Sequence, residues 1–131
     1  MVPELQKRGV KPIGLSCDKL PKHVKWSKDV LEYGGIKKDN LSYPILADYD
    51  RSVAKKFDML PNDPNHKDED GLPLTVRSVF LIDPSRKLKL NLTYPASTGR
   101  SWPEVLRAID SIQLAARHPI GWCCFEFVLG L

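Results

Sequence analysis

Three cysteines are the side chains best suited to covalent chemistry in this sequence: Cys17, Cys123 and Cys124. A cysteine reacts as its thiolate, and adjacent cysteines can also hold a metal or close a strained disulfide. An odd number of cysteines argues against a disulfide framework and favours a reducing compartment, so we expect a cytoplasmic protein. No histidine or further cysteine lies at ligand spacing from the pair 123–124, so no metal site is expected there. Cys17 is expected to be a buried structural cysteine.

Histidines and arginines are the other candidates for a reactive site. His23, His66 and His118 are scattered along the chain without ligand spacing, and His66 is expected to be solvated. Arg77 stands at the start of an apolar run, and Arg100 stands in a loop before a helical pattern. Residue type alone does not separate these two arginines from ordinary surface arginines.

The composition is that of one soluble globular domain. The chain has 131 residues, 42% of them hydrophobic and 27% charged, with a net charge of +4. Its basic residues lie among acidic neighbours rather than on one patch, so no nucleic-acid partner is expected. The longest apolar stretch, residues 119–131, is interrupted by Glu126 and is shorter than the about 20 residues that cross a bilayer. We therefore expect no membrane span.

Apolar periodicity and turn residues predict the elements that must position a site. Helices are expected over Pro3–Arg8, from an Asp18 cap to Tyr33, over Arg51–Met59 with Asp50 as cap, and from Ser101 to Pro119. Extended segments are expected over Val10–Ser16, Tyr43–Leu46, Thr75–Ile82 and Lys87–Thr93, with a polar loop over 62–71. This order predicts a mixed α/β fold with an antiparallel pair near its end.

Three of these elements carry the clearest patterns. Continuous apolar residues predict that Thr75–Ile82 is a buried central strand, whereas alternation in Lys87–Thr93 predicts an edge strand with one wet face. Ser101 and Glu104 have the spacing of a capping box. The last helix has an apolar stripe formed by Val105, Leu106, Ile109, Ile112 and Ala116.

Several short strings, taken together, resemble one family. They are GLSCD at 14–18, His23 with WSKD at 26–29, YPI at 43–45 followed by Asp48, LTVR at 74–77 and, most specifically, YPASTGR at 94–100. Over residues 3–117 their order resembles that of the 1-Cys peroxiredoxins. The resemblance implies a thioredoxin-like fold, a homodimer and the reduction of hydrogen peroxide and organic hydroperoxides. It implies no bound cofactor or metal, but an external thiol reductant such as glutathione.

The resemblance also assigns expected roles to two residues. Arg77 matches the active-site arginine, which would favour a thiolate and orient the peroxide through fixed N–H donors. Arg100 matches a supporting arginine. The attacking cysteine of the family lies in a motif Pro-x3-Thr-x2-Cys, and none of the three cysteines here has that neighbourhood. The peroxidatic cysteine is therefore expected to be absent, and the chain inactive alone.

The expected architecture is a partial thioredoxin-like fold that lacks the N-terminal strands and the active-site helix. Residues 1–118 are expected to form a truncated peroxiredoxin domain, and residues 119–131 a divergent hydrophobic tail. Three interpretations follow. The chain is part of a longer peroxidase, or a non-catalytic fragment that pairs with full-length peroxiredoxin, or a product that does not fold. Pairing is expected through the edge strand 87–93.

Overall fold

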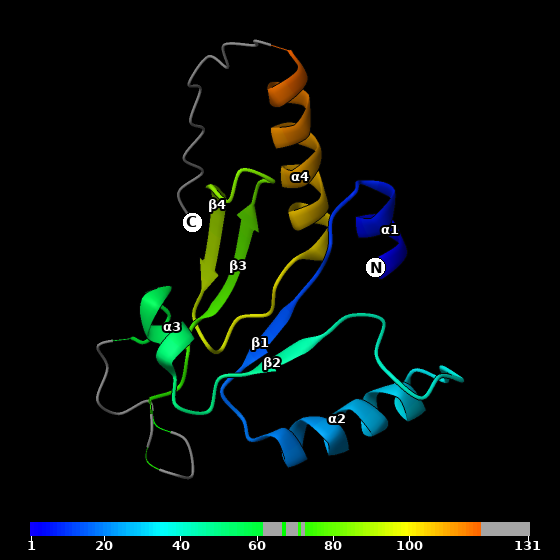
Figure 1. Cartoon of the computed structure of the whole chain (residues 1–131), viewed down its shortest axis with the longest axis vertical. Coiled ribbons are helices and arrows are strands. Elements are labelled where there is room, and N and C mark those ends of the chain that lie inside the picture. The colour runs from blue at the N-terminus through cyan, green and yellow to red at the C-terminus, as the bar shows by residue number, and fades with distance from the viewer. Residues whose placement is uncertain (62–66, 68–70, 72, 119–131) are drawn as a thin grey trace.

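The computed structural model describes residues 1–61, 67, 71 and 73–118 (Figure 1). These residues form the following helices and strands: α1 (Val2–Lys7), β1 (Gly14–Ser16), α2 (Leu20–Tyr33), β2 (Ile45–Ala47), α3 (Ser52–Lys56), β3 (Arg77–Ile82), β4 (Leu88–Tyr94) and α4 (Trp102–Arg117). Their order confirms the predicted mixed α/β fold. The tail 119–131, with Cys123 and Cys124, and the loop residue His66 lie outside the described residues. The division at residue 118 stays a prediction.

The strands form two separate two-stranded sheets (Figure 1). β1 and β2 are parallel, with Gly14 opposite Ile45, and the backbone N–H of Asp48 extends the pairing to Ser16. β3 and β4 are antiparallel, and Arg77 lies opposite Tyr94. The parallel and antiparallel pairs expected of a thioredoxin-like fold are thus present, but in this part of the chain no strand joins them into one sheet.

β3 is not the buried central strand that its apolar run predicts. Its four middle residues are half-buried, and both end residues, Arg77 and Ile82, are exposed. Within the described ranges β3 pairs with a strand on one edge only, so its other edge is left open. The alternation in β4 holds from Leu90 to Leu92, because both leucines are half-buried while Asn91 is exposed, but Leu88 at the start of the strand is exposed.

The helix and strand boundaries differ from the predicted ones where local hydrogen bonds compete. β1 begins only at Gly14, after Pro12, which cannot donate to a ladder. α2 starts from Lys19 rather than Asp18, whose carboxylate accepts a bond from the Ser16 hydroxyl at 2.6 Å. The predicted capping box of α4 does not form: Glu104 accepts two bonds from Arg107, at 2.8 and 2.7 Å.

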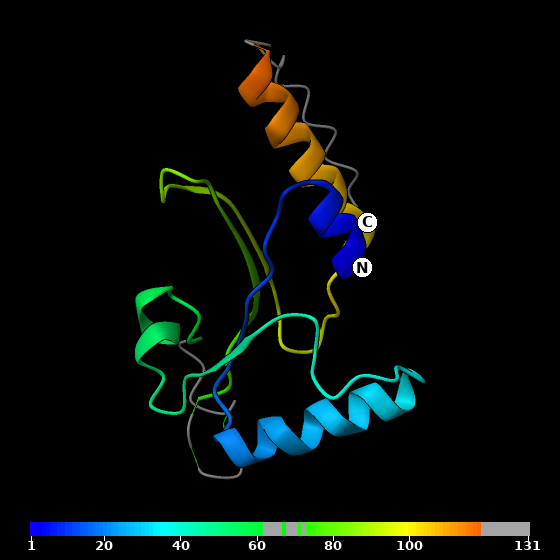
Figure 2. The same ribbon diagram turned by 45° about the vertical axis from the view of Figure 1, so that its right-hand side comes forward.

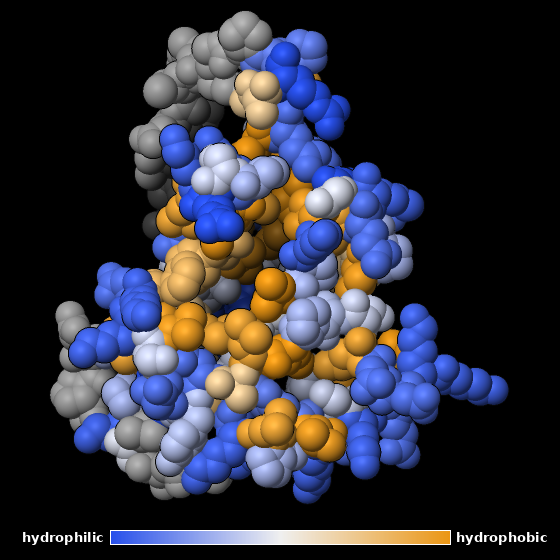
Figure 3. Space-filling model, in the orientation of Figure 1, coloured by the Kyte–Doolittle hydropathy of each residue, from blue (hydrophilic) through white to orange (hydrophobic). Residues whose placement is uncertain are grey.

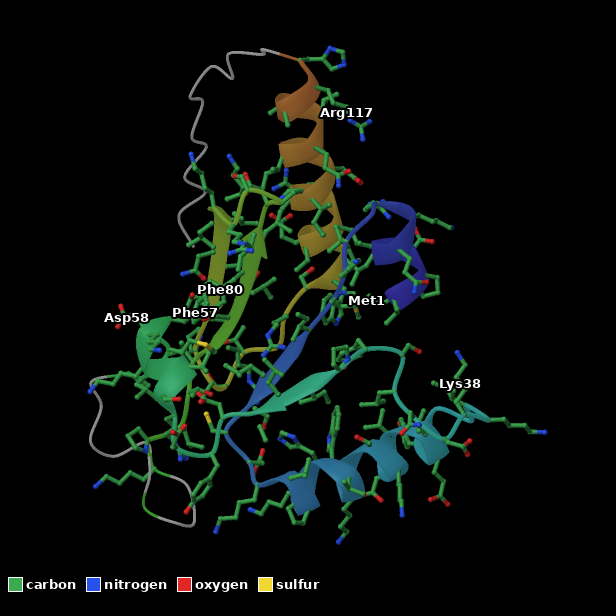
Figure 4. The ribbon with its side chains drawn as sticks, viewed as in Figure 1. Met1, Lys38, Phe57, Asp58, Phe80 and Arg117 are labelled. Carbon is green, nitrogen blue, oxygen red and sulfur yellow. The ribbon has the colours of Figure 1, made fainter. Side chains whose placement is uncertain are left out.

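The core lies where α1 and α4 pack on the antiparallel pair (Figure 2). Its buried residues are Leu5 of α1 and Val105 and Ile109 of α4, and half-buried residues surround them: Val10, Val79, Leu81, Leu92 and Leu106. The apolar stripe predicted for α4 is confirmed in its first two turns, but Ala116 is exposed. A second contact joins α3 to β3, because the rings of Phe57 and Phe80 point toward each other with centroids 4.9 Å apart (Figure 4).

Much apolar surface is left uncovered. Figure 3 shows hydrophobic residues gathered across the middle of one face, between hydrophilic margins. No helix in the described part of the chain is long and apolar enough to cross a membrane.

Candidate active site

Arg77 is held in place by the loop that carries the most specific string of the sequence. It is the first residue of β3, and its Nε donates a hydrogen bond of 2.7 Å to the carbonyl oxygen of Ala96. Tyr94 ends β4 opposite Arg77, and the chain then turns at Pro95, whose carbonyl accepts the N–H of Thr98 at 2.9 Å. The side chain of Arg77 is exposed, so its remaining N–H donors are available.

Arg100 lies within electrostatic reach of Arg77. It precedes α4, at the end of the same loop. The pKa of the Arg100 guanidinium is lowered, first by the loss of hydration around it and then by the positive charge of Arg77, whereas Tyr43 acts in the opposite direction. The two arginines that the sequence singled out, one at a strand start and one in a loop, are therefore near enough for their charges to interact. Their roles stay predictions.

Neither arginine of this pair is neutralised by a carboxylate in the described ranges. Other arginines are: Arg8 pairs with Glu4 and Asp110, and Arg107 pairs with Glu104. Two neighbouring cations without an acidic partner repel each other, and an anion placed between them would relieve that repulsion. The arrangement is suited to bind an anion or a group that becomes anionic during a reaction.

An apolar pocket adjoins the loop that holds Arg77. Its volume is about 410 Å³, within the usual range for small-molecule sites. Its lining comes from the segment before β3 and from the end of β4: Pro61, Leu74, Thr75, Val76, Thr93, Tyr94, Pro95 and Ala96. The arginine pair therefore has an apolar neighbour that could receive the organic part of a ligand.

The other candidate residues do not join this site. Cys17 follows β1 and is half-buried rather than buried. His23 of α2 is 8% exposed, and neither of its ring nitrogens has a protein hydrogen-bond partner in the described part of the chain. It lines another pocket, of about 570 Å³, between α2 and residues 39–45. No group of three or more acidic, histidine or cysteine residues suited to a metal occurs among the described residues.

Sequence reasoning missed two residues that organise the approach to Arg77. Asp48 is 4% exposed and accepts the backbone N–H groups of Val53 and Ala54, at 3.0 and 2.7 Å, so it caps α3. The sequence predicted Asp50 for this role. Arg51 is 7% exposed and has a positive φ of 58°. Arginine has no preference for that backbone conformation, so no sequence signal marks it.

The fold is that of a thioredoxin-like α/β protein, with Arg77 at the start of β3 and Arg100 in the loop between β4 and α4. The chain belongs to the AhpC/TSA family, whose profile matches residues 1–91. It is 47% identical to Peroxiredoxin-6 of Gallus gallus over 98% of this chain and 59% of that protein. It is 45% identical to the 1-Cys peroxiredoxin of Onchocerca volvulus, over 93% of this chain and 56% of that protein.

A solved structure supports the same assignment. Peroxiredoxin 6 of Arenicola marina, in a cysteine-to-serine mutant, superposes with a TM-score of 0.83 at 46% identity, over 95% of this chain and 56% of that one. The predicted resemblance to 1-Cys peroxiredoxins and the thioredoxin-like fold class are thereby confirmed. The chain spans between half and three fifths of the length of these relatives.

Proposed function

We propose that this chain carries the arginine part of a thiol peroxidase site that reduces hydrogen peroxide and organic hydroperoxides. The observation that supports it is that the charges of Arg77 and Arg100 interact and that neither residue has an acidic partner in the described ranges. The guanidinium N–H donors would lower the pKa of a cysteine beside them and hold the peroxide oxygens in line for attack. The adjoining apolar pocket would receive the organic part of a hydroperoxide.

The proposed reaction needs no bound cofactor or metal. The thiolate attacks one peroxide oxygen, the O–O bond breaks, and the second oxygen leaves as hydroxide or alkoxide and takes up a proton. The sulfur is thereby oxidised to sulfenic acid. An external thiol such as glutathione then condenses with the sulfenic acid, which releases water and leaves a mixed disulfide, and a second thiol reduces that disulfide.

The attacking cysteine is proposed to come from a segment outside this sequence. None of the three cysteines lies in the motif Pro-x3-Thr-x2-Cys. We therefore propose that the 131-residue chain alone has no peroxidase activity by this mechanism. A cytoplasmic location belongs to the same proposal, and its support is the odd number of cysteines.

A chimera tests the proposal. The part of Gallus gallus Peroxiredoxin-6 that precedes the matched region is joined to residues 1–118 of this chain, and peroxide consumption is measured with a thiol reductant. We expect activity in the chimera and none in the 131-residue chain. Arg77→Ala should lower kcat/KM by about 10²- to 10³-fold, because it removes donors aimed at the developing charge. Arg77→Lys, which keeps the charge without the planar donors, should lower it by about tenfold.

Arg107→Ala serves as the control. Arg107 is also exposed, but it lies on α4 and pairs with Glu104, so its loss should change kcat/KM by less than about twofold. A folded chimera whose activity does not depend on Arg77 would refute the proposal, and so would peroxidase activity in the 131-residue chain.

A second candidate function is dimerisation through β4, either with a second copy or with a longer peroxiredoxin. Within the described residues β4 pairs with β3 on one side only, and an open strand edge favours pairing with another chain. Successive residues direct their N–H groups to opposite sides, so one of Leu90 and Asn91 points to the open edge. Proline at that position should convert a dimer into monomers in light-scattering measurements, while proline at the other should disrupt the β3–β4 pair. A chain that is monomeric at all concentrations, alone and beside a longer relative, would contradict this function.

A further inference from the structure

Arg51 occupies a backbone conformation that glycine would adopt more easily. Its φ and ψ are 58° and 21°, in the left-handed region, where a side chain costs about 1–2 kcal/mol. Its side chain is nevertheless 7% exposed, although a buried charged residue needs partners to offset the loss of hydration. Both features indicate that the guanidinium forms interactions that glycine could not provide.

Two of those interactions join segments far apart in sequence. Nη1 donates to the carbonyl oxygen of Tyr49 at 3.1 Å, within the same turn. Nε donates to the carbonyl oxygen of Pro73 at 3.1 Å, 22 residues later. A guanidinium presents several N–H donors in one rigid plane, so it can hold two carbonyls at a fixed separation, whereas a lysine ammonium has no such planar arrangement.

The segment that Arg51 holds leads directly to Arg77. Three residues beyond Pro73, the N–H of Val76 donates to the carbonyl oxygen of Met59 at 2.9 Å. The chain is therefore fixed from both ends of α3 before β3 begins at Arg77. Arg77 then donates to Ala96 at 2.7 Å, a bond that depends on where β3 starts.

We propose that Arg51 is a positioning residue, which places the guanidinium of Arg77 by fixing the segment 73–76. The proposal rests on the proposed function in so far as the position of Arg77 matters for peroxide reduction. Arg51 itself is buried and is assigned no contact with substrate.

Nuclear magnetic resonance of the 131-residue chain tests the placement without any catalytic step. The Nε–Hε signal of Arg77 is assigned by its loss in Arg77→Lys, and its exchange with solvent is measured. Arg51→Gly removes the guanidinium and suits the left-handed backbone, while Arg51→Lys keeps the charge without the planar donors. In both variants we expect the Arg77 signal to shift and its exchange to speed up by about five- to tenfold, as for the loss of one hydrogen bond.

Arg86→Gly is the matched control. Arg86 also has a positive φ, of 64°, but it is exposed in the turn before β4, so its loss should leave the Arg77 signal unchanged. A role of Arg51 limited to stability would lower the unfolding midpoint and leave the Arg77 signal in place under native conditions.

Three results would overturn the proposal. The first is an unchanged Arg77 signal in folded Arg51→Gly. The second, which applies if Arg51→Gly does not fold, is an unchanged Arg77 signal in folded Arg51→Lys. The third requires no variant: an Arg51 Nε–Hε that exchanges as fast as a free guanidinium in the unmodified chain. An inactive chimera with an Arg77 signal that responds to Arg51 would refute the peroxidase function alone and leave the positioning intact.

Discussion

Asp48 shows how much a single buried carboxylate contributes at the residue scale. It satisfies two backbone N–H groups at the start of α3, and its neighbour Arg51 begins the link to β3. Asp48→Ala would leave both donors without an acceptor in a buried place. We expect the free energy of unfolding to fall by about 2 kcal/mol, measured by urea denaturation of the 131-residue chain.

Asp50→Ala is the control for this change. Asp50 lies in the same turn but is exposed, and it accepts the N–H of Ser52 at 3.1 Å. Its replacement should lower the stability by clearly less than that of Asp48. If the two variants were equally stable, burial would not be the reason for the contribution of Asp48.

The same pair shows what could be predicted from the sequence at this scale. The spacing of Asp50 before an apolar pair predicts a cap, but it cannot reveal that Asp48, the residue after β2, is buried and accepts the N–H groups of Val53 and Ala54. Arg77 and Arg100 were singled out from short strings, and in the structure the charge of Arg77 acts on Arg100. The role of Arg51 depends on a contact across 22 residues, which local patterns do not encode.

At the scale of elements, α1 is attached to α4 by a side-chain clamp. Arg8 donates to both oxygens of Asp110, at 2.6 and 3.0 Å, and to Glu4 at 3.1 Å, while Gln113 donates to the Arg8 carbonyl at 2.7 Å. The hydrogen bond from Arg8 holds the pKa of Asp110 below its ordinary value. A carboxyl with a lowered folded-state pKa stabilises the fold above its unfolded-state pKa, about 3.9. That contribution is lost as the pH falls through the lowered value.

Asp110→Asn tests the clamp and its sign. At pH 7 the variant should unfold at lower urea concentration than the unmodified chain, and the difference should shrink as the pH falls through the lowered pKa of Asp110. Hydrogen exchange of the Val10 amide, which donates to Leu5 at 2.9 Å, should speed up at pH 7 because α1 detaches. Glu104→Gln breaks a pair within α4 only and should leave that amide protected. A pH-independent difference would show that Asp110 acts by packing rather than by charge.

Periodicity predicts whether a segment is a helix or a strand, but it does not predict which neighbouring elements bury that segment. The alternation of Leu90 and Leu92 with polar residues correctly predicts one wet face for β4. The apolar run of β3 predicts burial on both faces, yet a face is buried only where another layer of the fold covers it completely. Likewise Ser101 and Glu104 have capping-box spacing, but Arg107 is a charged competitor for the same carboxylate. In both cases the prediction differs from the structure because the result depends on a neighbouring element or side chain that the local sequence pattern does not include.

At the scale of the whole molecule, the described part of the chain leaves several large apolar side chains exposed. No large side chain in the described part of the chain is fully buried. Ile13, Leu46 and Ile82, beside or within the strands, are 66%, 51% and 51% exposed. Each such side chain forgoes about 1.5–3 kcal/mol of burial.

Uncovered strands predict that the chain alone is less stable than the chimera described above. If the preceding part of a longer relative covers even two of these side chains, the thermal midpoint of the chimera should lie about 10–20 °C above that of the 131-residue chain. The chain alone should also bind a fluorescent dye for exposed apolar surface, and the chimera should bind less.

The substitution Ile13→Ser tests whether the preceding segment buries Ile13 or only stabilises the fold in general. It should cost about 2 kcal/mol in the chimera, where Ile13 is covered, and less than about 0.5 kcal/mol in the chain alone, where it is already wet. An equal loss of stability in both proteins would mean that the preceding segment does not cover Ile13, and that this side chain stays exposed to solvent in the longer protein as well.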